Sequence, residues 1–499
     1  MFKLKQLHEL IVPWISGINV KIPYLTGLEL DSRNINFGNL FIAIQGYNTD
    51  GRLHIDDAIN NGAVAILSES YNKSTFFIKK IVNNVEVIPI IYFNQLNKCI
   101  SNIAGRFYDH PSLCLKLIGV TGTNGKTTIT HLLTNWTSLL GERSAVMGTL
   151  GNGVLSDINP SCCTTCSAIE TQKILKQFVQ SGVTFVAMEI SSHGLDQYRV
   201  DSLYFDVAIF SNISNDHLDY HNNINQYRMA KWRLFNELRV KNYVINVDDC
   251  VGYRWLLSLS NAVAVTIKNN LPRSWSGRWI ALVKADYYLY GTKIVFKSSW
   301  GNGFIHSQLL GEVNVSNILL ALGALLIMGY SLKSLLYTGS KLYPVCGRLE
   351  VLSCLNHPTV IVDYAHTPDA LKKILIFAKH LCNKGRLWCI FGCGGNRDRS
   401  KRSLMGVIAN RYSDYVIITN DNPRVEDPKL IIDDIICKIR NSEKLKIIED
   451  RVYAINMVVS KACSDDFVLI LGKGHEKYQN IGLNYISHSD QDIVKSIFK

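Results

Sequence analysis

The feature of this sequence that most restricts its fold is a glycine-rich loop between an apolar run and a helical pattern. In LIGVTGTNGKTTITHLL, the run from Leu115 to Val120 has the composition of a buried strand, and the loop after it leads directly into the helix. A strand, a short loop and a helix in this order are typical of α/β folds. We therefore expect α/β domains built on parallel sheets.

The same loop predicts a phosphate-binding site. Gly122 and Gly125 let the backbone approach phosphate oxygens, and the loop N–H groups and the helix N-terminus attract an anion. Lys126 is expected to reach the β and γ phosphates of a nucleotide, and Thr127 to offer its hydroxyl to Mg²⁺. The spacing differs from the common G-x-x-x-x-G-K-[ST] pattern because position 120 is valine, so a turn without phosphate affinity is the alternative.

The length of 499 residues requires more than one domain, because single hydrophobic cores stop growing at about 250 to 300 residues. Changes of motif divide the chain into blocks at residues 1–110, 111–344 and 345–499. The second and third blocks are predicted to be mostly parallel α/β sheets. Expected strands of the third block are Thr359 to Val362, Leu387 to Phe391, Tyr415 to Thr419 and Phe467 to Leu471. Ligands of such sheets bind beyond the carboxyl ends of the strands.

Composition excludes several classes of protein. The formal charge of +12 comes from dispersed lysines and arginines, which argues against nucleic-acid binding. The longest apolar stretch, Leu319 to Met328, is about half of what a membrane span requires. The N-terminus lacks a secretory-signal pattern, and the 13 cysteines have neither framework nor zinc-finger spacing. We expect a cytoplasmic protein without membrane insertion or structural zinc.

Polar residues after other predicted strands are further candidates. In FVAMEISSHGLDQYRV an apolar run ends in Glu189, and such a carboxylate is a natural partner of Mg²⁺; an exposed loop acid is the alternative. His217, in NDHLDYH, is by itself more typical of packing or capping. Arg348 can offer a fork of donors to a developing phosphate charge. Arg397, in a glycine-rich turn, suits bidentate carboxylate recognition, with a surface arginine as the alternative.

Taken in order, these motifs resemble those of the Mur ligase family. TGTNGKT resembles the phosphate loop that Mur ligases share with folylpolyglutamate synthases, and NDHLDYH, YRMAKWRLF, CGRLE, DYAHTPDAL, DNPR and LILGKGHEKYQ follow in the family's order. The resemblance covers essentially the whole chain. It implies a small N-terminal uridine-binding α/β domain, a central P-loop ATPase domain with a parallel sheet, and a C-terminal Rossmann-like α/β domain. It also implies an ATP-dependent ligase that forms an amide through an acyl phosphate.

The resemblance assigns the catalytic and nucleotide-binding residues. In the family, the histidine at the position of His217 binds a second Mg²⁺, and the lysine at the position of Lys231 is carbamylated to N6-carboxylysine, an anionic oxygen ligand. The implied metal ligands are Thr127, Glu189, His217 and carbamylated Lys231, and the implied catalytic residues are Lys126, Glu189, His217, Lys231 and Arg348. The implied ATP contacts are Gly122, Thr123, Asn124, Gly125, Lys126, Thr127, Thr128, Asn317, Arg348, Asp363 and His366.

The implied reaction joins meso-diaminopimelate to UDP-muramoyl-L-alanyl-D-glutamate in bacterial peptidoglycan synthesis. The positions matching the family's contacts to the muramoyl dipeptide are Leu30, Ser32, Tyr47, Asn48, Thr49, Thr164, Thr165, Ser191, Gln197 and Arg199. DNPR resembles the diaminopimelate-recognition motif, in which Arg424 would meet the distal carboxylate that lysine lacks. The implied contacts of the amino acid are Arg397, Asp421, Asn422, Pro423, Arg424, Gly472 and Glu476.

This chain departs from the family pattern at several positions. Cys163 and Cys166 replace the usual asparagine and glycine around the paired threonines, which weakens Thr164 as a substrate contact. Asn215, Cys346 and Asn396 stand where arginine, proline and aspartate are common. None of these changes removes a group assigned to chemistry, so we expect an active enzyme.

Three alternatives remain beside the expected monomeric, diaminopimelate-adding ligase. A lysine-adding member of the family would have the same chemistry, but its motif would lack the arginine at Arg424. A folylpolyglutamate synthase would share the phosphate loop without DNPR. A basic ATP-driven nucleic-acid-binding protein would need a contiguous basic face or stacking aromatic residues.

Overall fold

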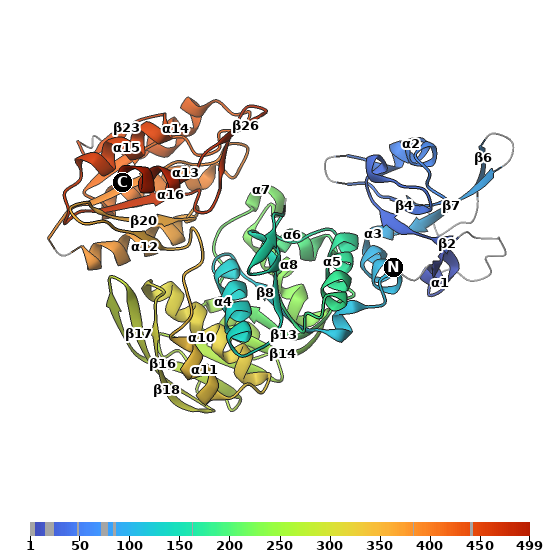
Figure 1. The fold of residues 1–499 in the computed structure, drawn as a ribbon, viewed down its shortest axis with the longest axis horizontal. Coiled ribbons are helices and arrows are strands. Elements are labelled where there is room, and N and C mark those ends of the chain that lie inside the picture. Colours follow the sequence, from blue (N-terminus) through green and yellow to red (C-terminus); the bar gives the residue numbers. More distant parts are fainter. Residues whose placement is uncertain are drawn as a thin grey trace. The chain divides into compact units, whose positions relative to one another are not determined.

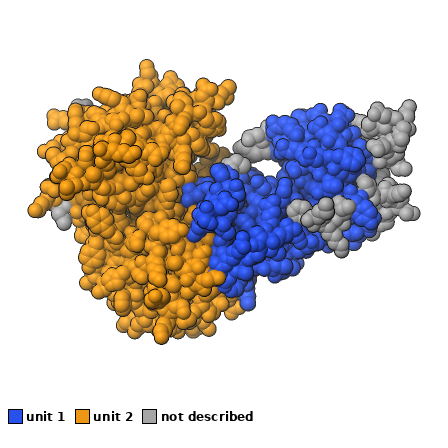
Figure 2. All heavy atoms as spheres, in the orientation of Figure 1, with its two compact units in different colours: residues 1–119, 142–206, 230–241 blue, residues 120–141, 207–229, 242–499 orange. Residues whose placement is uncertain are grey.

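The computed structural model describes residues 5–14, 24–46, 49–70, 78–82, 86–161, 163–382, 384–439 and 443–499. The chain folds into two compact units, which Figure 2 shows in different colours. Unit 1 comprises residues 1–119, 142–206 and 230–241, and unit 2 comprises residues 120–141, 207–229 and 242–499. Each unit therefore combines segments that are far apart in the sequence.

The first sheet is built from residues 27–94 of unit 1. Its strand order is β3-β4-β5-β7-β6, and all neighbours are parallel except β6, which pairs antiparallel with β7. The strands are β3 (Gly27–Glu29), β4 (Asn39–Ala43), β5 (Ala65–Ser70), β6 (Ile78–Val82) and β7 (Glu86–Asn94), and a separate pair joins β1 (Lys5–Gln6) to β2 (Tyr24–Leu25). The helices are α1 (Leu7–Ile11), α2 (Ile55–Asn60) and α3 (Leu96–Phe107), with short 3₁₀ turns at Ser32–Asn34, Gly51–His54 and Pro111–Cys114.

Both faces of this first sheet are covered. Along β4, Leu40 and Ile42 belong to the core that includes α3, whereas Phe41 and Ala43 belong to the core that includes α2. Because successive side chains of a strand point to opposite faces, burial of both faces explains the uninterrupted apolar run of β4.

The largest sheet has the strand order β11-β10-β9-β12-β8-β13-β14-β15-β16-β17-β18 among the described residues. Strand β9 is parallel to β12, and β15 is parallel to both β14 and β16, while antiparallel hairpins form the two edges. The bounds are β8 (Lys116–Thr121), β9 (Ser144–Gly148), β10 (Gly151–Val154), β11 (Asp157–Asn159), β12 (Phe185–Glu189), β13 (Tyr204–Phe210), β14 (Arg239–Asn246), β15 (Ala262–Thr266), β16 (Arg278–Tyr288), β17 (Gly291–Ser298) and β18 (Gly301–Ser307).

Helix α10 (Gly311–Ile327) contains most of the longest apolar stretch of the sequence. The helix is buried over most of its length, and its Gly323 lies beside Val244, Val263 and Ile280 of the sheet. A helix that is apolar on all sides is buried, and within the described ranges no helix is long and apolar enough to cross a membrane. The other helices here are α4 (Lys126–Leu139), α5 (Ala168–Gln180), α6 (Ser192–Asp196), α7 (Leu218–His221), α8 (Ile224–Asn236), α9 (Cys250–Leu256) and α11 (Leu332–Gly339).

The last sheet has the order β19-β20-β24-β21-β22-β23, parallel except for β19, and helices cover both faces (Figure 1). Its strands are β19 (Glu350–Leu352), β20 (Thr359–Asp363), β21 (Leu387–Phe391), β22 (Tyr415–Ile418), β23 (Leu445–Ile447) and β24 (Phe467–Leu471). The helices are α12 (Pro368–Leu381), α13 (Ser400–Tyr412), α14 (Pro428–Ile436), α15 (Arg451–Lys461) and α16 (Asp490–Ile497), beside a hairpin of β25 (Tyr478–Ile481) and β26 (Asn484–Ser487). The predicted parallel α/β architecture is confirmed.

Insertion of β24 between β20 and β21 creates a reversal in strand order. Ligands of open parallel sheets bind at such a point, beyond the carboxyl ends of the strands. The loops that follow β20, β24, β21 and β22 therefore meet at one edge, and these loops contain the motifs DYAHTP, GKGHE, GCGGNR and TNDNPR.

Candidate active site

The phosphate loop joins β8 to α4 and is held by the loop that follows β13. Gly122 and Gly125 have φ angles of 148° and 89°, which favour glycine. The Thr123 amide donates to the Asn212 carbonyl at 2.8 Å, and the Asn124 amide donates to the Asn212 side chain at 3.1 Å. The loop conformation is therefore supported by neutral hydrogen bonds from a neighbouring strand end.

The side chains of the loop also make contacts inside unit 2. Lys126 Nζ donates to the carbonyls of Gly122 at 2.8 Å and Thr123 at 2.9 Å, so its ammonium lies over the loop. Thr127 Oγ1 accepts from Arg348 Nη2 at 3.1 Å. Thr127 and the neighbouring Thr128 are buried at the start of α4.

Asn317 of α10 approaches the same loop. A Cβ at Gly125 would lie 2.6 Å from Asn317 Oδ1, so the glycine permits this approach. The Asn317 amide donates to Asn314 Oδ1 at 3.2 Å, which fixes its orientation.

Arg348 lies between the phosphate loop and the loop after β20. Its Cζ is 4.3 Å from the Tyr364 ring centroid, a cation–π contact. Asp363 accepts from the amides of Leu349 at 2.8 Å and Ala365 at 2.7 Å. Limited access of water raises the pKa of Asp363, and the Arg348 charge opposes this rise. Asp363 thus joins the residue after Arg348 to the loop after β20.

Two histidines also lie near Arg348. Desolvation, followed by the Arg348 charge, lowers the pKa of His131 on α4 to about 4 and that of His475 to about 3. Both imidazoles are therefore neutral at physiological pH.

Asp216 joins His217 to His366, a contact that sequence reasoning missed. The buried Asp216 carboxylate lies 3.5 Å from His217 Nε2, 3.7 Å from His366 Nε2 and 3.5 Å from Lys401 Nζ. Although burial raises it, the pKa of Asp216 is held well below its usual range by His366, His217 and Lys401. Asp216 directly precedes His217 in NDHLDYH, and this neighbouring acid is the sequence feature that could have predicted the contact.

In unit 1, Glu189 stands at the end of β12 and is buried. Its Oε1 accepts from the Thr149 amide at 2.9 Å, and its Oε2 accepts from the Thr149 hydroxyl at 3.2 Å. The Thr149 hydroxyl also lies 3.0 Å from that of Thr164. A side chain at Gly148 would clash with Glu189, so this glycine makes room for the carboxylate.

Thr165 connects the predicted dipeptide-binding residues of unit 1. Its hydroxyl donates to the Glu189 carbonyl and accepts from the Ser191 amide, both at 2.9 Å. Its carbonyl accepts from Arg199 Nη1 at 2.6 Å, and the same guanidinium holds Gln197 Oε1. Four of the predicted residues are therefore brought together, with Ser191 also capping α6.

The remaining predicted contacts of the muramoyl dipeptide lie in the first sheet domain. Ser32 is buried in the 3₁₀ turn after Leu30, and its carbonyl accepts from Asn61 Nδ2 at 2.9 Å. Thr49 is exposed and its carbonyl accepts from the Gly46 amide. Tyr47 and Asn48 lie outside the described residues.

A buried lysine organises the loops at the carboxyl edge of the last sheet. Lys473 Nζ donates to Asn422 Oδ1 at 3.0 Å and to Glu476 Oε2 at 2.9 Å. Asn422 Nδ2 also donates to Glu476 Oε2, at 2.7 Å. Asn422 and Glu476 are predicted amino-acid contacts, whereas Lys473 was missed, because a lysine between two glycines gives no signal of burial.

The two predicted arginines meet at the turn after β21. Arg424, with φ 54°, donates from Nη1 to the Gly395 carbonyl at 2.7 Å. A Cβ at Gly394 would lie 3.0 Å from Arg424 Nη1 and 3.7 Å from Arg397 Cγ, so both side chains flank this glycine.

The other predicted amino-acid contacts lie close to these arginines in the fold. A side chain at Gly395 would clash with the carbonyl of the buried Pro423, so the turn after β21 packs on DNPR. A Cβ at Gly472 (φ 108°) would lie 2.5 Å from Asp421 Oδ2, which brings these two predicted residues together.

The predicted metal ligands are divided between the units. Thr127 and His217 belong to unit 2, whereas Glu189 and Lys231 belong to unit 1, where Lys231 on α8 is 1% exposed. In the described part of the chain, no group of three or more histidines, cysteines and acids forms a metal cluster. By their chemistry alone, a hydroxyl, a carboxylate, an imidazole and the carbamate implied for Lys231 are mainly oxygen donors, the donor type that Mg²⁺ prefers.

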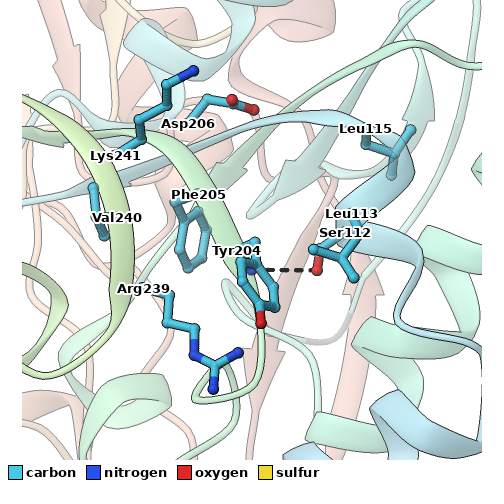
Figure 3. A pocket seen from close by; sticks show the side chains of 9 residues that line it. All are labelled: Ser112, Leu113, Leu115, Tyr204, Phe205, Asp206, Arg239, Val240 and Lys241. Atoms are coloured by element: carbon cyan, nitrogen blue, oxygen red, sulfur yellow. Dashed lines mark hydrogen bonds between the residues drawn. The ribbon is translucent and has the colours of Figure 1, made fainter.

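A cavity of about 470 Å³ lies at the amino-terminal ends of β8, β13 and β14 (Figure 3). It is lined by Ser112, Leu113, Leu115, Tyr204, Phe205, Asp206, Arg239, Val240 and Lys241. Tyr204 and Arg239 are the first residues of β13 and β14, and the Arg239 guanidinium lies 4.8 Å from the Tyr204 ring centroid. Within the described residues, none of the predicted site residues lines this cavity.

Three sections of the chain match one family. Residues 24–108 match the Mur ligase family catalytic domain, residues 120–325 the Mur ligase middle domain, and residues 347–474 the Mur ligase glutamate ligase domain.

Solved structures of related enzymes are similar over most of the chain. A UDP-N-acetylmuramoyl-L-alanyl-D-glutamate–2,6-diaminopimelate ligase is 34% identical, with 99% of each chain covered and a TM-score of 0.69. The MurF ligase from Thermotoga maritima in complex with ADP is 18% identical, with 95% of this chain and 96% of that chain covered and a TM-score of 0.64. The folylpolyglutamate synthase of Mycobacterium tuberculosis, in complex with ADP and AMPPCP, is 16% identical, with 75% and 92% covered and a TM-score of 0.60.

Proposed function

Since the chain belongs to the Mur ligase family of ATP-dependent amide ligases, we propose that it adds meso-diaminopimelate to the D-glutamate of UDP-muramoyl-L-alanyl-D-glutamate. The product would be a peptidoglycan precursor. The observation that supports this amino acid most directly is that the Arg424 guanidinium and the Cγ of the Arg397 side chain both lie beside Gly394. Two arginines on one turn suit an amino acid with two carboxylates.

The contacts of the phosphate loop support its role toward ATP. Lys126 and Arg348 bring two cations to the loop, and the loop amides add further donors. Asn124 Nδ2 and Arg348 Nε are buried donors without a hydrogen-bond partner among the described residues. Because buried donors are normally paired, phosphate oxygens are suitable acceptors for both.

The amide forms in two steps. The D-glutamate carboxylate attacks the γ-phosphate and ADP leaves, which gives an acyl phosphate. The amine of diaminopimelate then attacks this carbonyl, and phosphate leaves. Lys126 and Arg348 screen the phosphate charge, while Thr165 and Arg199 orient the dipeptide, so most of the catalysis is positioning and electrostatics.

Mg²⁺ would be held by Thr127, Glu189, His217 and carbamylated Lys231, and when bound it neutralises phosphate charge. The burial of Lys231 supports the modification, since an ammonium is costly to bury and a carbamate supplies oxygen ligands to a hard cation.

The first test is phosphate release by the purified full chain with ATP, Mg²⁺ and the UDP-muramoyl dipeptide. We expect release with meso-diaminopimelate and none with L-lysine. Release with lysine alone would replace the proposal by a lysine-adding ligase, and release with neither amino acid would refute it.

A second test concerns the pocket itself. Arg424→Ala should raise the KM for diaminopimelate by about 10- to 100-fold, because a hydrogen bond to a charged group contributes about 1.5 to 3 kcal/mol. Arg399→Ala is the matched control, because Arg399 pairs with Asp434 on the surface instead. Equal KM values for the two variants would contradict the assignment of Arg424.

We further propose that the protein acts as a monomer in the bacterial cytoplasm, with domain boundaries near residues 110 and 344. The cytoplasm supplies ATP and keeps thiols reduced, which suits a chain with 13 cysteines. Cell fractionation and the mass in solution test the location and the oligomeric state.

A further inference from the structure

Two cysteines flank the paired threonines of unit 1, in the segment Cys163-Thr164-Thr165-Cys166. Both are free thiols; Cys163 is half-buried and Cys166 is 3% exposed. The Cys163 thiol donates to the Thr165 carbonyl at 3.3 Å, and Cys166 Sγ accepts from Asn152 Nδ2 at 3.4 Å. The Cys163 thiol therefore bonds within the C-x-x-C segment, whereas the buried Cys166 thiol contacts β10.

The two thiols interact with each other. A side-chain hydrogen bond from Cys163 lowers the pKa of Cys166 to about 7, against the opposing effects of burial and Glu170. Helix α5 begins two residues after Cys166, and a helix N-terminus stabilises a thiolate.

Several other described cysteines have the opposite environment. Where a shift is resolved among the described cysteines, burial raises the thiol pKa instead, at Cys99, Cys346, Cys382, Cys389 and Cys393. A low thiol pKa beside a second thiol is the arrangement found in dithiol redox sites. Among the described cysteines, Cys163 and Cys166 are thus distinguished by their C-x-x-C spacing and by the lowered thiol pKa of Cys166.

The threonines between the cysteines belong to the hydrogen-bond network at the end of β12. Thr165 bonds the Glu189 carbonyl and the Ser191 amide, and Thr164 reaches Glu189 through Thr149. A covalent bond between the flanking sulfurs would take the Cys163 thiol from the Thr165 carbonyl. This carbonyl is also the acceptor of Arg199.

We propose that Cys163 and Cys166 are a redox modification site, at which a reversible disulfide switches the ligase off by displacing Thr164 and Thr165. The oxidant is a small-molecule or protein disulfide. One thiolate of the pair attacks a sulfur of this disulfide and expels a thiolate from it. The second cysteine loses its proton to solvent and displaces the remaining oxidant thiolate from the mixed disulfide. Two cysteine thiols become one disulfide, and the oxidant becomes two thiols.

The first measurement needs no substrate. The full-length chain is equilibrated with mixtures of oxidised and reduced glutathione, its free thiols are alkylated, and its peptides are mapped by mass spectrometry. We expect a disulfide between Cys163 and Cys166 that reductant reverses. Cys162, which lies outside the described residues, is a competing partner, and Cys162→Ser should leave the disulfide unchanged. Failure of the pair to oxidise while other cysteines do so would overturn the proposal.

The second measurement links the disulfide to activity, and only here does the inference rest on the proposed substrates. Oxidation should lower the ligase rate by about tenfold or more, because misplaced substrate-positioning groups slow the reaction. Cys163→Ser and Cys166→Ser should resist the oxidant, whereas Cys354→Ser, at an exposed site, should remain sensitive. If the disulfide forms but the ligase rate does not fall, the proposed switch is wrong. If the disulfide forms as expected but the reduced protein has no ligase activity, only the proposed function is contradicted.

Discussion

Two Gly-Lys dipeptides follow buried strands in this chain, and they have opposite environments. Lys126, after β8, is half-buried and lies over the carbonyls of its own loop. Lys473, after β24, is fully buried and ion-paired with Glu476, 2.9 Å away. Neutral hydrogen bonds join the phosphate loop to the loop after β13, whereas a buried cation joins the loops of the proposed amino-acid site. The same dipeptide thus contains a buried, ion-paired lysine in one region and, in the other, the lysine that we propose to bind phosphate.

The largest effect expected from this comparison is on catalysis at Lys126. Lys126→Ala should lower the rate of phosphate release by about 10³-fold, since it removes a charge from the transferring phosphate. The free energy of unfolding should change by less than about 1 kcal/mol, because the loop keeps its backbone hydrogen bonds. Urea unfolding checks the second point, with Lys333→Ala on α11 as the control. A large loss of stability in Lys126→Ala would show that Lys126, like Lys473, has a structural role.

At Lys473 we expect the main effect of a substitution to be on stability and not on catalysis. Lys473→Met should lower the free energy of unfolding by about 3 kcal/mol, because Glu476 and Asn422 lose a buried partner. Urea unfolding measures this change, and Lys477→Met is the matched control at an exposed position four residues later. A stability of Lys473→Met equal to that of the control would show that the buried ion pair contributes nothing.

The smallest effect concerns His475, which lies near both regions. Desolvation, Arg348, His131 and Lys473 lower its pKa from 6.5 to about 3. The unfolded chain therefore binds a proton below pH 6.5, while the folded chain does so only near pH 3. Stability from this group is complete above pH 6.5 and is lost as the pH falls toward 3.

Between pH 6.5 and pH 5, the wild type should lose up to about 2 kcal/mol more stability than His475→Gln, which does not titrate. Urea unfolding at a series of pH values measures the difference. Parallel curves would mean that His475 is solvated in the native protein.

Much of the fold could be predicted because the sequence patterns that indicate it are local. The apolar runs at Leu387–Phe391 and Phe467–Leu471 are β21 and β24 with the predicted bounds. The phosphate loop was equally readable, because its glycines, lysine and helix start are adjacent in sequence. The strand order was not predicted, since the insertion of β24 between β20 and β21 depends on pairing between distant segments.

At the candidate site, the contacts that the sequence did not predict are mainly long-range contacts between polar side chains. Thr149 reaches Glu189 from 40 residues away, and Lys473 reaches Asn422 from 51 residues away. Neither residue differs locally from a surface threonine or lysine. Asp363 was expected to contact ATP, which stays a prediction, while its hydrogen bonds from the amides of Leu349 and Ala365 were not foreseen.

The position of β24 also has a consequence for biosynthesis. A ribosome synthesises the centre of the last sheet after both of its neighbours, because β24 spans residues 467–471 and pairs between β20 (Thr359–Asp363) and β21 (Leu387–Phe391). The buried pair of Arg451 with Asp490 is completed later still. A nascent chain can thus complete the phosphate loop long before it acquires an amino-acid pocket. In prematurely terminated chains, β20 and β21 would lack β24 as a pairing partner. Their exposed strand edges would let proteases recognise these chains as incompletely folded.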